Sequence, residues 1–126
     1  MPVMLVATAR NAADLFAPLL NGGDGETVAV AHLDAAGRLL GITTREGEGS
    51  QVTLPIREIV ADALRLGTAG LIAAHNHPSG AAEPSAADLD ATHRLGQVAA
   101  ALDMRLLDHL IFGSEDVVSL RGLGLL

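Results

Sequence analysis

The segment 75–88 holds the side chains of this sequence that are best suited to chemistry. His75 and His77 are two positions apart, and Pro78 disfavours a helical conformation for His77. In an extended backbone, side chains two positions apart point to the same side, so both imidazoles can reach one ion. Imidazole and carboxylate groups are good zinc ligands, and three protein ligands plus a water is the usual catalytic arrangement. Together with Asp88, the two histidines therefore predict a catalytic zinc site.

Asp88 has two interpretations, and they are compatible. Ser85 and Asp88 have the spacing of a capping box at the start of a helix. The helical phase also indicates that Asp88 faces inward, because it lies seven residues before Leu95 on an apolar stripe. A buried carboxylate is costly unless it is paired or bound to metal. The two histidines provide a reason for this carboxylate to be there.

A hydrolytic zinc site also needs a base that takes a proton from the bound water. Glu83 and Asp90 are close to the histidines in the sequence, whereas Glu26 is distant. The residues alone do not choose among these three carboxylates. On local evidence, Glu26 at the start of a strand is typical of a solvated side chain.

The order His75-Asn76-His77 resembles the letters of an HNH nuclease, but the residues of that motif are dispersed in sequence and the chain lacks a basic face. Asp108 and His109 could support the metal site, although an ordinary hydrogen bond at a strand edge is our default interpretation. Three histidines stand outside the metal-binding pattern: His32, His93 and His109.

Composition limits the classes of function. The 126 residues have the size of one ordinary domain, which we expect to span 1–126. The formal net charge is −7 and all eight basic residues are arginines, which argues against broad contact with nucleic acid. The absence of cysteine excludes disulfides, thiolate zinc sites and the zinc deaminases. No apolar run reaches membrane-spanning length and residues 1–9 lack a basic leader, so we predict a cytoplasmic protein without membrane contact.

Periodicity and turn residues predict alternating helices and strands. The apolar run 70–74 is typical of a central strand buried on both faces, and it delivers His75 at its end. Pro55 and Gly67 mark the start and end of a helix, whose apolar stripe is Ile56, Ile59, Val60, Ala63 and Leu64. We expect further helices over 12–20, with Asn11 as N-cap, and over 85–102, with the stripe Leu95, Val98, Ala99 and Leu102. Strands are expected over 3–8, 26–33, 38–44, 105–112 and 117–120, with a hairpin turn at 34–37.

The pattern His-x-His-Pro-x6-Ser-x2-Asp resembles the metal-binding signature of the JAB/MPN (JAMM) metalloprotease family. The flanking sequences resemble the bacterial RadC branch of that family in order and spacing. They are Pro55-Ile56-Arg57-Glu58-Ile59, His75-Asn76-His77-Pro78-Ser79-Gly80, Pro84-Ser85 and Leu107-Asp108-His109-Leu110-Ile111. The resemblance extends from Glu26 to Leu126, and the combined motif is highly specific.

The resemblance implies an α/β fold, a mixed β-sheet flanked by α-helices, and a zinc metallopeptidase or isopeptidase that acts on a peptide or protein substrate. It implies that His75, His77 and Asp88 bind Zn²⁺. The family pattern includes a glutamate ahead of a strand that ends in Leu-Asp, which matches Glu26 followed by Leu33-Asp34. The resemblance thus selects Glu26 as general acid and base, and Ser85 as the hydrogen-bond donor to the oxyanion.

Two other functions remain as alternatives. Scaffold members of the family bind protein partners without catalysis, but they typically lose the metal ligands that this chain keeps. Many RadC-like proteins also carry an N-terminal helix-hairpin-helix segment associated with DNA contact, for which these residues leave no room, so we expect no DNA binding. The polar loop 45–50 is expected to be a mobile hairpin loop, with substrate gating as the minor alternative. The apolar tail 122–126 is expected to dock on the domain or on a second copy, which would give a homodimer.

Overall fold

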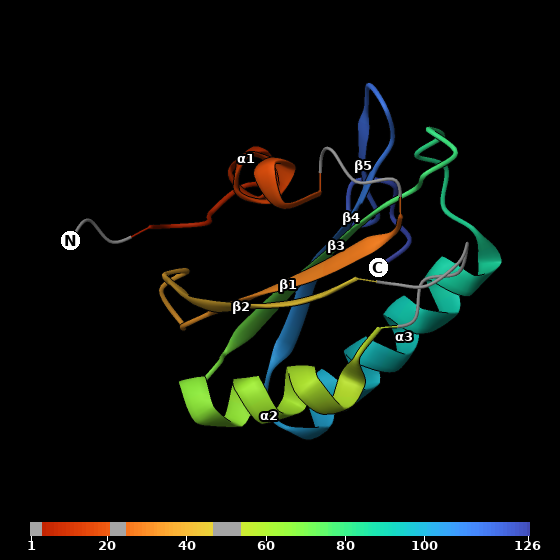
Figure 1. The fold of residues 1–126 in the computed structure, drawn as a ribbon. Coiled ribbons are helices and arrows are strands. Elements are labelled where there is room, and N and C mark those ends of the chain that lie inside the picture. Colours follow the sequence, from red (N-terminus) through yellow and green to blue (C-terminus); the bar gives the residue numbers. More distant parts are fainter. Residues whose placement is uncertain (1–3, 21–24, 47–53) are drawn as a thin grey trace.

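A computed structural model describes residues 4–20, 25–46 and 54–126 (Figure 1). Within these residues, five strands form one sheet in the order β2-β1-β3-β4-β5, in which only β3 and β4 pair in parallel. The predicted α/β class, with a mixed sheet flanked by helices, is confirmed. In chain order the elements are α1 (Ala9–Leu20), β1 (Thr27–Leu33), β2 (Leu39–Glu46), α2 (Ile56–Leu66), β3 (Gly70–Asn76), α3 (Ala86–Ala101), β4 (Arg105–Phe112) and β5 (Val117–Ser119).

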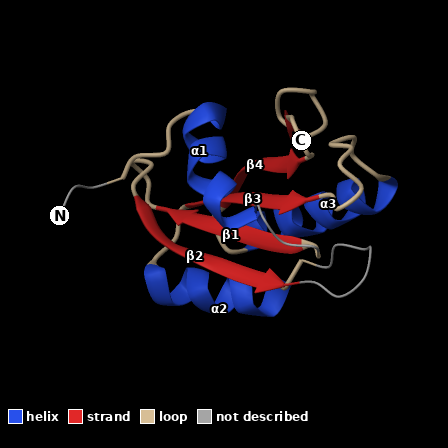
Figure 2. Ribbon diagram, turned by 45° about the horizontal axis from the view of Figure 1, so that its top comes forward, coloured by secondary structure: helices blue, strands red, loops and turns tan. Residues whose placement is uncertain are grey.

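The helices lie on both faces of the sheet, with α1 on one face and α2 and α3 on the other (Figure 2). Each face has its own apolar core because successive side chains of a strand point to opposite sides. The core under α1 includes Phe16, Leu33, Ile72 and Leu110. The core under α2 and α3 includes Val30, Ile59, Leu71 and Leu95. As predicted, every residue of β3 is buried.

The topology brings four chain segments to one edge of the sheet. β3, α3 and β4 form a parallel crossover unit, so the end of β3 lies beside the end of β4 and near the start of α3. β1 runs antiparallel to β3 and pairs Val28 with His75, which brings the start of β1 to the same edge. This edge therefore collects residues that are far apart in the sequence.

Helices α2 and α3, which cover the same face of the sheet, begin and end largely where the sequence predicts. Gly67 ends α2 in the left-handed conformation, with φ of 71°, which glycine adopts without steric cost. Leu64, however, is 68% exposed, and Leu102 is exposed at the C-terminal cap of α3. The predicted apolar stripes were therefore too wide at their last positions, whereas Ile59, Ala63, Leu95 and Ala99 are buried against the sheet.

The predicted strand over 3–8 is wrong for its described part, in which Leu5 forms only an isolated bridge with Arg38. The first helix starts earlier than predicted, at Ala9, because Thr8 is the capping side chain and accepts a hydrogen bond from the Asn11 backbone at 3.0 Å. Asn11 lies inside this helix, and its side chain accepts from the Ala7 backbone.

The structure confirms one of the two predicted loops, describes the other in part, and shows where the last residue of the tail lies. Arg45 and Glu46 belong to β2, while positions 47–50 of the expected loop lie outside the described residues. The hairpin turn at 34–37 is confirmed, since the Asp34 carboxylate accepts backbone hydrogen bonds from Ala36 and Arg38. Leu126 lines an apolar groove between α3 and β4, although it stays 41% exposed.

Candidate metal centre

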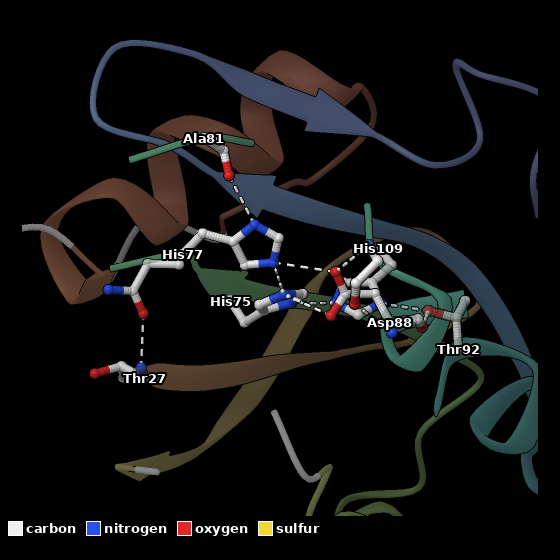
Figure 3. A network of polar contacts seen from close by, with 9 residues as sticks. Thr27, His75, His77, Ala81, Asp88, Thr92 and His109 are labelled. Atoms are coloured by element: carbon white, nitrogen blue, oxygen red, sulfur yellow. Dashed lines mark hydrogen bonds and ion pairs between the residues drawn. The ribbon is translucent and has the colours of Figure 1, made fainter. Parts of the chain in front are cut away.

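Three side chains from the predicted motif converge at the shared edge of the sheet (Figure 3). His75 is the second-to-last residue of β3, His77 follows that strand, and Asp88 lies in the first turn of α3. The two imidazole Nε2 atoms are 3.0 Å apart. One carboxylate oxygen of Asp88 lies 3.2 Å from His75 Nε2, and the other lies 3.0 Å from His77 Nε2. Both imidazoles thus face the same point, as the spacing predicts.

The orientation of His77 leaves its Nε2 lone pair free. Its Nδ1 donates a hydrogen bond to the Ala81 carbonyl oxygen at 2.7 Å, because a carbonyl can only accept. In the neutral ring, Nε2 is then an acceptor that points at His75 Nε2 and at the Asp88 carboxylate. Lone pairs and a negative charge that face one another at about 3 Å favour a cation between them. This arrangement fits a bound metal ion.

Asp88 is both a helix cap partner and a candidate ligand, as the sequence suggested. The Ser85 hydroxyl oxygen accepts from the Asp88 backbone at 3.0 Å, and the Asp88 carboxylate accepts from the Ser85 backbone at 2.8 Å. This capping box starts α3 and holds the carboxylate toward the histidines. Burial alone would raise the pKa of Asp88, but the contact with His75 and the hydrogen bond from the Ser85 backbone hold that pKa well below its usual value. The carboxylate is therefore ionised and ready to bind a cation.

Glu26 lies at the same edge and is only 3% exposed. Burial raises its pKa, which the nearby His75 and His77 partly offset and Asp88 reinforces. Among the residues that the structure describes, its Oε2 is the one buried side-chain polar atom without a hydrogen-bond partner. Such an atom is costly in a native fold unless a ligand or solvent satisfies it. Glu83 and Asp90, the other two candidate bases, are both exposed.

Asn76 fixes the backbone on both sides of Glu26, a role that the sequence did not indicate. Its side-chain oxygen accepts from the Thr27 backbone at 2.6 Å, and its side-chain nitrogen donates to the Gly25 carbonyl at 3.1 Å. Both bonds close the gap between the start of β1 and the end of β3. Asn76 therefore fixes the position of the glutamate relative to the two histidines.

For His109, the default interpretation of an ordinary hydrogen bond at a strand edge is wrong. The Asp108 carboxylate does make local hydrogen bonds, to the backbones of His109 and Arg121, and Ser119 donates to it. The His109 side chain, however, is fully buried against the metal centre, with Nε2 2.7 Å from His75 Nδ1. Burial, with the nearby His75, lowers the pKa of His109 to about 3, so its ring is neutral.

The other two histidines lie elsewhere. His32 is buried between β1 and α2, where its nitrogens contact Thr68 at 2.9 Å and Thr43 at 2.8 Å. His93 is exposed on α3. As the sequence suggested, neither belongs to the cluster of His75, His77 and Asp88.

The donor set fits zinc. Two neutral imidazole nitrogens and one carboxylate are typical catalytic zinc ligands, and three protein ligands leave a coordination position for water or substrate. The two Nε2 atoms are 3.0 Å apart and each lies 3.0 to 3.2 Å from one of the two Asp88 oxygens, slightly less than the separation of about 3.3–3.6 Å expected between ligands of one tetrahedral ion with bonds of about 2.0–2.2 Å. The buried carboxylate of Glu26, whose Oε2 has no hydrogen-bond partner among the described residues, is near enough to interact electrostatically with all three of these side chains.

Comparison with known proteins shows the family of this chain. The family model described as RadC-like JAB domain matches residues 6–125, and the chain belongs to this family. A UPF0758 protein of Acidithiobacillus ferrooxidans is 50% identical over 100 residues, which cover 79% of this chain and 45% of that protein. The UPF0758 protein of Leptothrix cholodnii is 46% identical over 104 residues, covering 82% and 47%.

A UPF0758 protein of a Polaromonas species is 40% identical over 123 residues, which cover 97% of this chain and 55% of that protein. The chain thus spans about half the length of the curated relatives it matches. Within the described residues, no helix combines the length and apolarity needed to cross a bilayer.

Proposed function

We propose that this domain is a zinc-dependent metallopeptidase or isopeptidase that hydrolyses an amide bond in a peptide or protein. One observation carries the proposal: the nitrogen and oxygen atoms of His75, His77 and Asp88 converge within electrostatic reach of the buried Glu26 carboxylate, whose Oε2 has no partner among the described residues. Membership of a JAB family supports the same chemistry. The ligand set is typical of a catalytic zinc site, because it leaves a position open.

The residues of the chain would divide the work. Zinc, when bound, would make a water nucleophilic at neutral pH and polarise the substrate carbonyl. Glu26 takes the proton of the attacking water and returns it to the departing amine. Its raised pKa favours this two-way transfer, because the carboxyl group holds a proton more readily than a solvated glutamate does. Its burial also keeps the proton away from bulk solvent.

Ser85 would stabilise the tetrahedral oxyanion. Its oxygen already accepts a hydrogen bond from the Asp88 backbone, so the hydroxyl proton stays available for donation. The residue is exposed at the start of α3, next to the ligand carboxylate. A donor in this position acts on negative charge that develops only in the transition state.

The direct test uses the zinc-loaded domain and a peptide library whose cleavage is followed by mass spectrometry. Glu26→Gln keeps the size of the side chain but removes the base, and we expect cleavage to fall by a factor on the order of 10²–10⁴ with zinc still bound. Glu83→Gln is the matched control, because Glu83 is exposed, and it should keep the activity of the wild type.

Full cleavage by Glu26→Gln would refute the assigned base. A wild-type domain that binds stoichiometric zinc but cleaves neither peptides nor protein conjugates would instead support a non-catalytic scaffold.

A further inference from the structure

A buried chain of hydrogen bonds starts at His75 Nδ1, the ring nitrogen other than the one that faces the Asp88 carboxylate (Figure 3). His75 Nδ1 lies 2.7 Å from His109 Nε2, and His109 Nδ1 lies 2.6 Å from the Thr92 hydroxyl oxygen. The Thr92 hydroxyl lies 2.7 Å from the backbone carbonyl of Asp88. His75, His109 and Thr92 are each at most 1% exposed.

The direction of every hydrogen bond in this chain follows from the acceptor at its end, the Asp88 carbonyl oxygen. The Asp88 carbonyl can only accept, so Thr92 uses its single proton there. The Thr92 oxygen is then left as an acceptor, and His109 Nδ1 must carry the proton that it receives. In a neutral His109, Nε2 is therefore an acceptor, and His75 Nδ1 donates to it. Each partner has one consistent role.

This direction determines the chemistry of His75. A ring with its proton on Nδ1 has a lone pair on Nε2, the atom that faces His77 and Asp88. The opposite tautomer would place a proton where a metal ion should bind. The chain also returns to Asp88, whose backbone ends it and whose side chain faces His75 Nε2.

We infer that His109 and Thr92 are positioning residues that hold His75 in its metal-binding tautomer and couple β3 and β4 to the first turn of α3. The inference rests on the metal site of the proposed function, but it requires no catalysis. Groups behind a metal-bound histidine orient the ring, and their loss typically weakens metal binding 10–100-fold. Neither residue needs to touch substrate.

Zinc affinity, measured by competition with a chromophoric chelator, tests the inference without an activity assay. Thr92→Val preserves shape but removes the hydroxyl, and we expect zinc binding to weaken by about 10–100-fold. Thr68→Val is the matched control, because Thr68 is a buried partner of His32 outside the metal site. That control should keep the zinc affinity of the wild type.

Replacement of His109 separates positioning from mere packing. His109→Gln keeps one acceptor and one donor, and it should retain more zinc affinity than His109→Leu, which keeps neither. Equal zinc affinity in wild type, Thr92→Val and His109→Leu would overturn the inference. An equal loss in Thr92→Val and Thr68→Val would also overturn it, because the effect would then reflect general destabilisation.

Nitrogen NMR of ¹⁵N-histidine-labelled protein reads the tautomers directly, in zinc-free and zinc-loaded samples. We expect the proton of His109 on Nδ1 and none on Nε2, and in Thr92→Val we expect this preference to weaken. A proton on His109 Nε2 in the wild type would overturn the inference. A wild type with the expected tautomer but no peptidase activity would refute only the proposed function.

Discussion

Two buried histidines show how similar residues serve different ends. His109 connects the metal centre to Thr92, whereas His32 connects β1 to β2 through Thr43 and to the segment after α2 through Thr68. Thr43, one of the threonines, also donates to the Asp62 carboxylate at 2.6 Å. A histidine buried among hydroxyl groups stays neutral, because burial penalises its charged form. The residue type alone does not distinguish a structural from a functional role.

His32 therefore predicts a pH dependence of stability. Burial lowers its pKa below 6.5 in the folded state, which Asp62 partly offsets and Arg65 reinforces. As pH falls below 6.5, the unfolded chain binds the proton first, so the stabilisation that is complete at higher pH is progressively lost. We expect His32→Gln to remove up to about 1.4 kcal/mol per pH unit from the slope of the unfolding free energy just below pH 6.5.

Urea unfolding of the zinc-free proteins at several pH values measures these slopes. The comparison concerns the slope and not the absolute stability, which the substitution also changes. Parallel slopes for wild type and His32→Gln would show that His32 does not bind a proton on unfolding.

At the scale of elements, the loop between β3 and α3 depends on a close approach to the end of β4. The His77 backbone donates to the Phe112 carbonyl, and the Ser114 backbone donates to the Gly80 carbonyl. A Cβ atom on Gly113 would lie 2.6 Å from the Gly80 carbonyl oxygen and 3.0 Å from the Ala82 nitrogen. Because both are backbone atoms, the loop itself would have to move.

Gly113→Ala should consequently damage both stability and metal binding. Overpacking typically costs about 1–3 kcal/mol, and a displaced Ala81 carbonyl would no longer orient His77. Gly96→Ala is the control, since its Cβ would meet only Leu106 at 3.9 Å, and alanine in a helix should stabilise by about 0.5–1 kcal/mol. Thermal unfolding and zinc titration of both variants check this. Equal behaviour of the two would contradict the role of the close approach.

The sequence predicted those features that local spacing determines. His75, His77 and Asp88 could be found from strand and helix periods alone, and the structure brings their ligand atoms within 4.8 Å of one another. Glu26 required the family resemblance, because its place depends on the antiparallel register between β1 and β3. Residue chemistry alone favoured a solvated side chain there, whereas the structure buries it.

Asn76 was missed, and His109 was predicted only as the minor alternative, because both roles depend on pairing between strands. Asn76 acts through the backbone of β1, and His109 through the parallel register of β3 and β4. For Thr92 and His109, the sequence did contain a signal. Thr92 lies on the same helical face as Asp88 and Leu95, and His109 interrupts the apolar strand 105–112. Polar residues on buried faces near a predicted metal site indicate a role in supporting the ligands.

At the scale of the whole molecule, the fold holds the candidate site by joining elements that are separate in sequence. The parallel crossover supplies β3, α3 and β4, and the antiparallel neighbour β1 adds Glu26. Apolar cores on both faces hold these elements rigidly in register. The resulting edge contains acceptor atoms that face one another, an arrangement that a divalent cation would stabilise.

The most direct test is a crystal structure of the zinc-loaded domain, with anomalous diffraction recorded on both sides of the zinc absorption edge. We predict one strong peak within about 2.0–2.2 Å of His75 Nε2, His77 Nε2 and an Asp88 carboxylate oxygen. The Glu26 carboxylate should lie next to the open coordination position. An empty site at saturating zinc, or an ion bound elsewhere with the two imidazoles turned apart, would contradict the account.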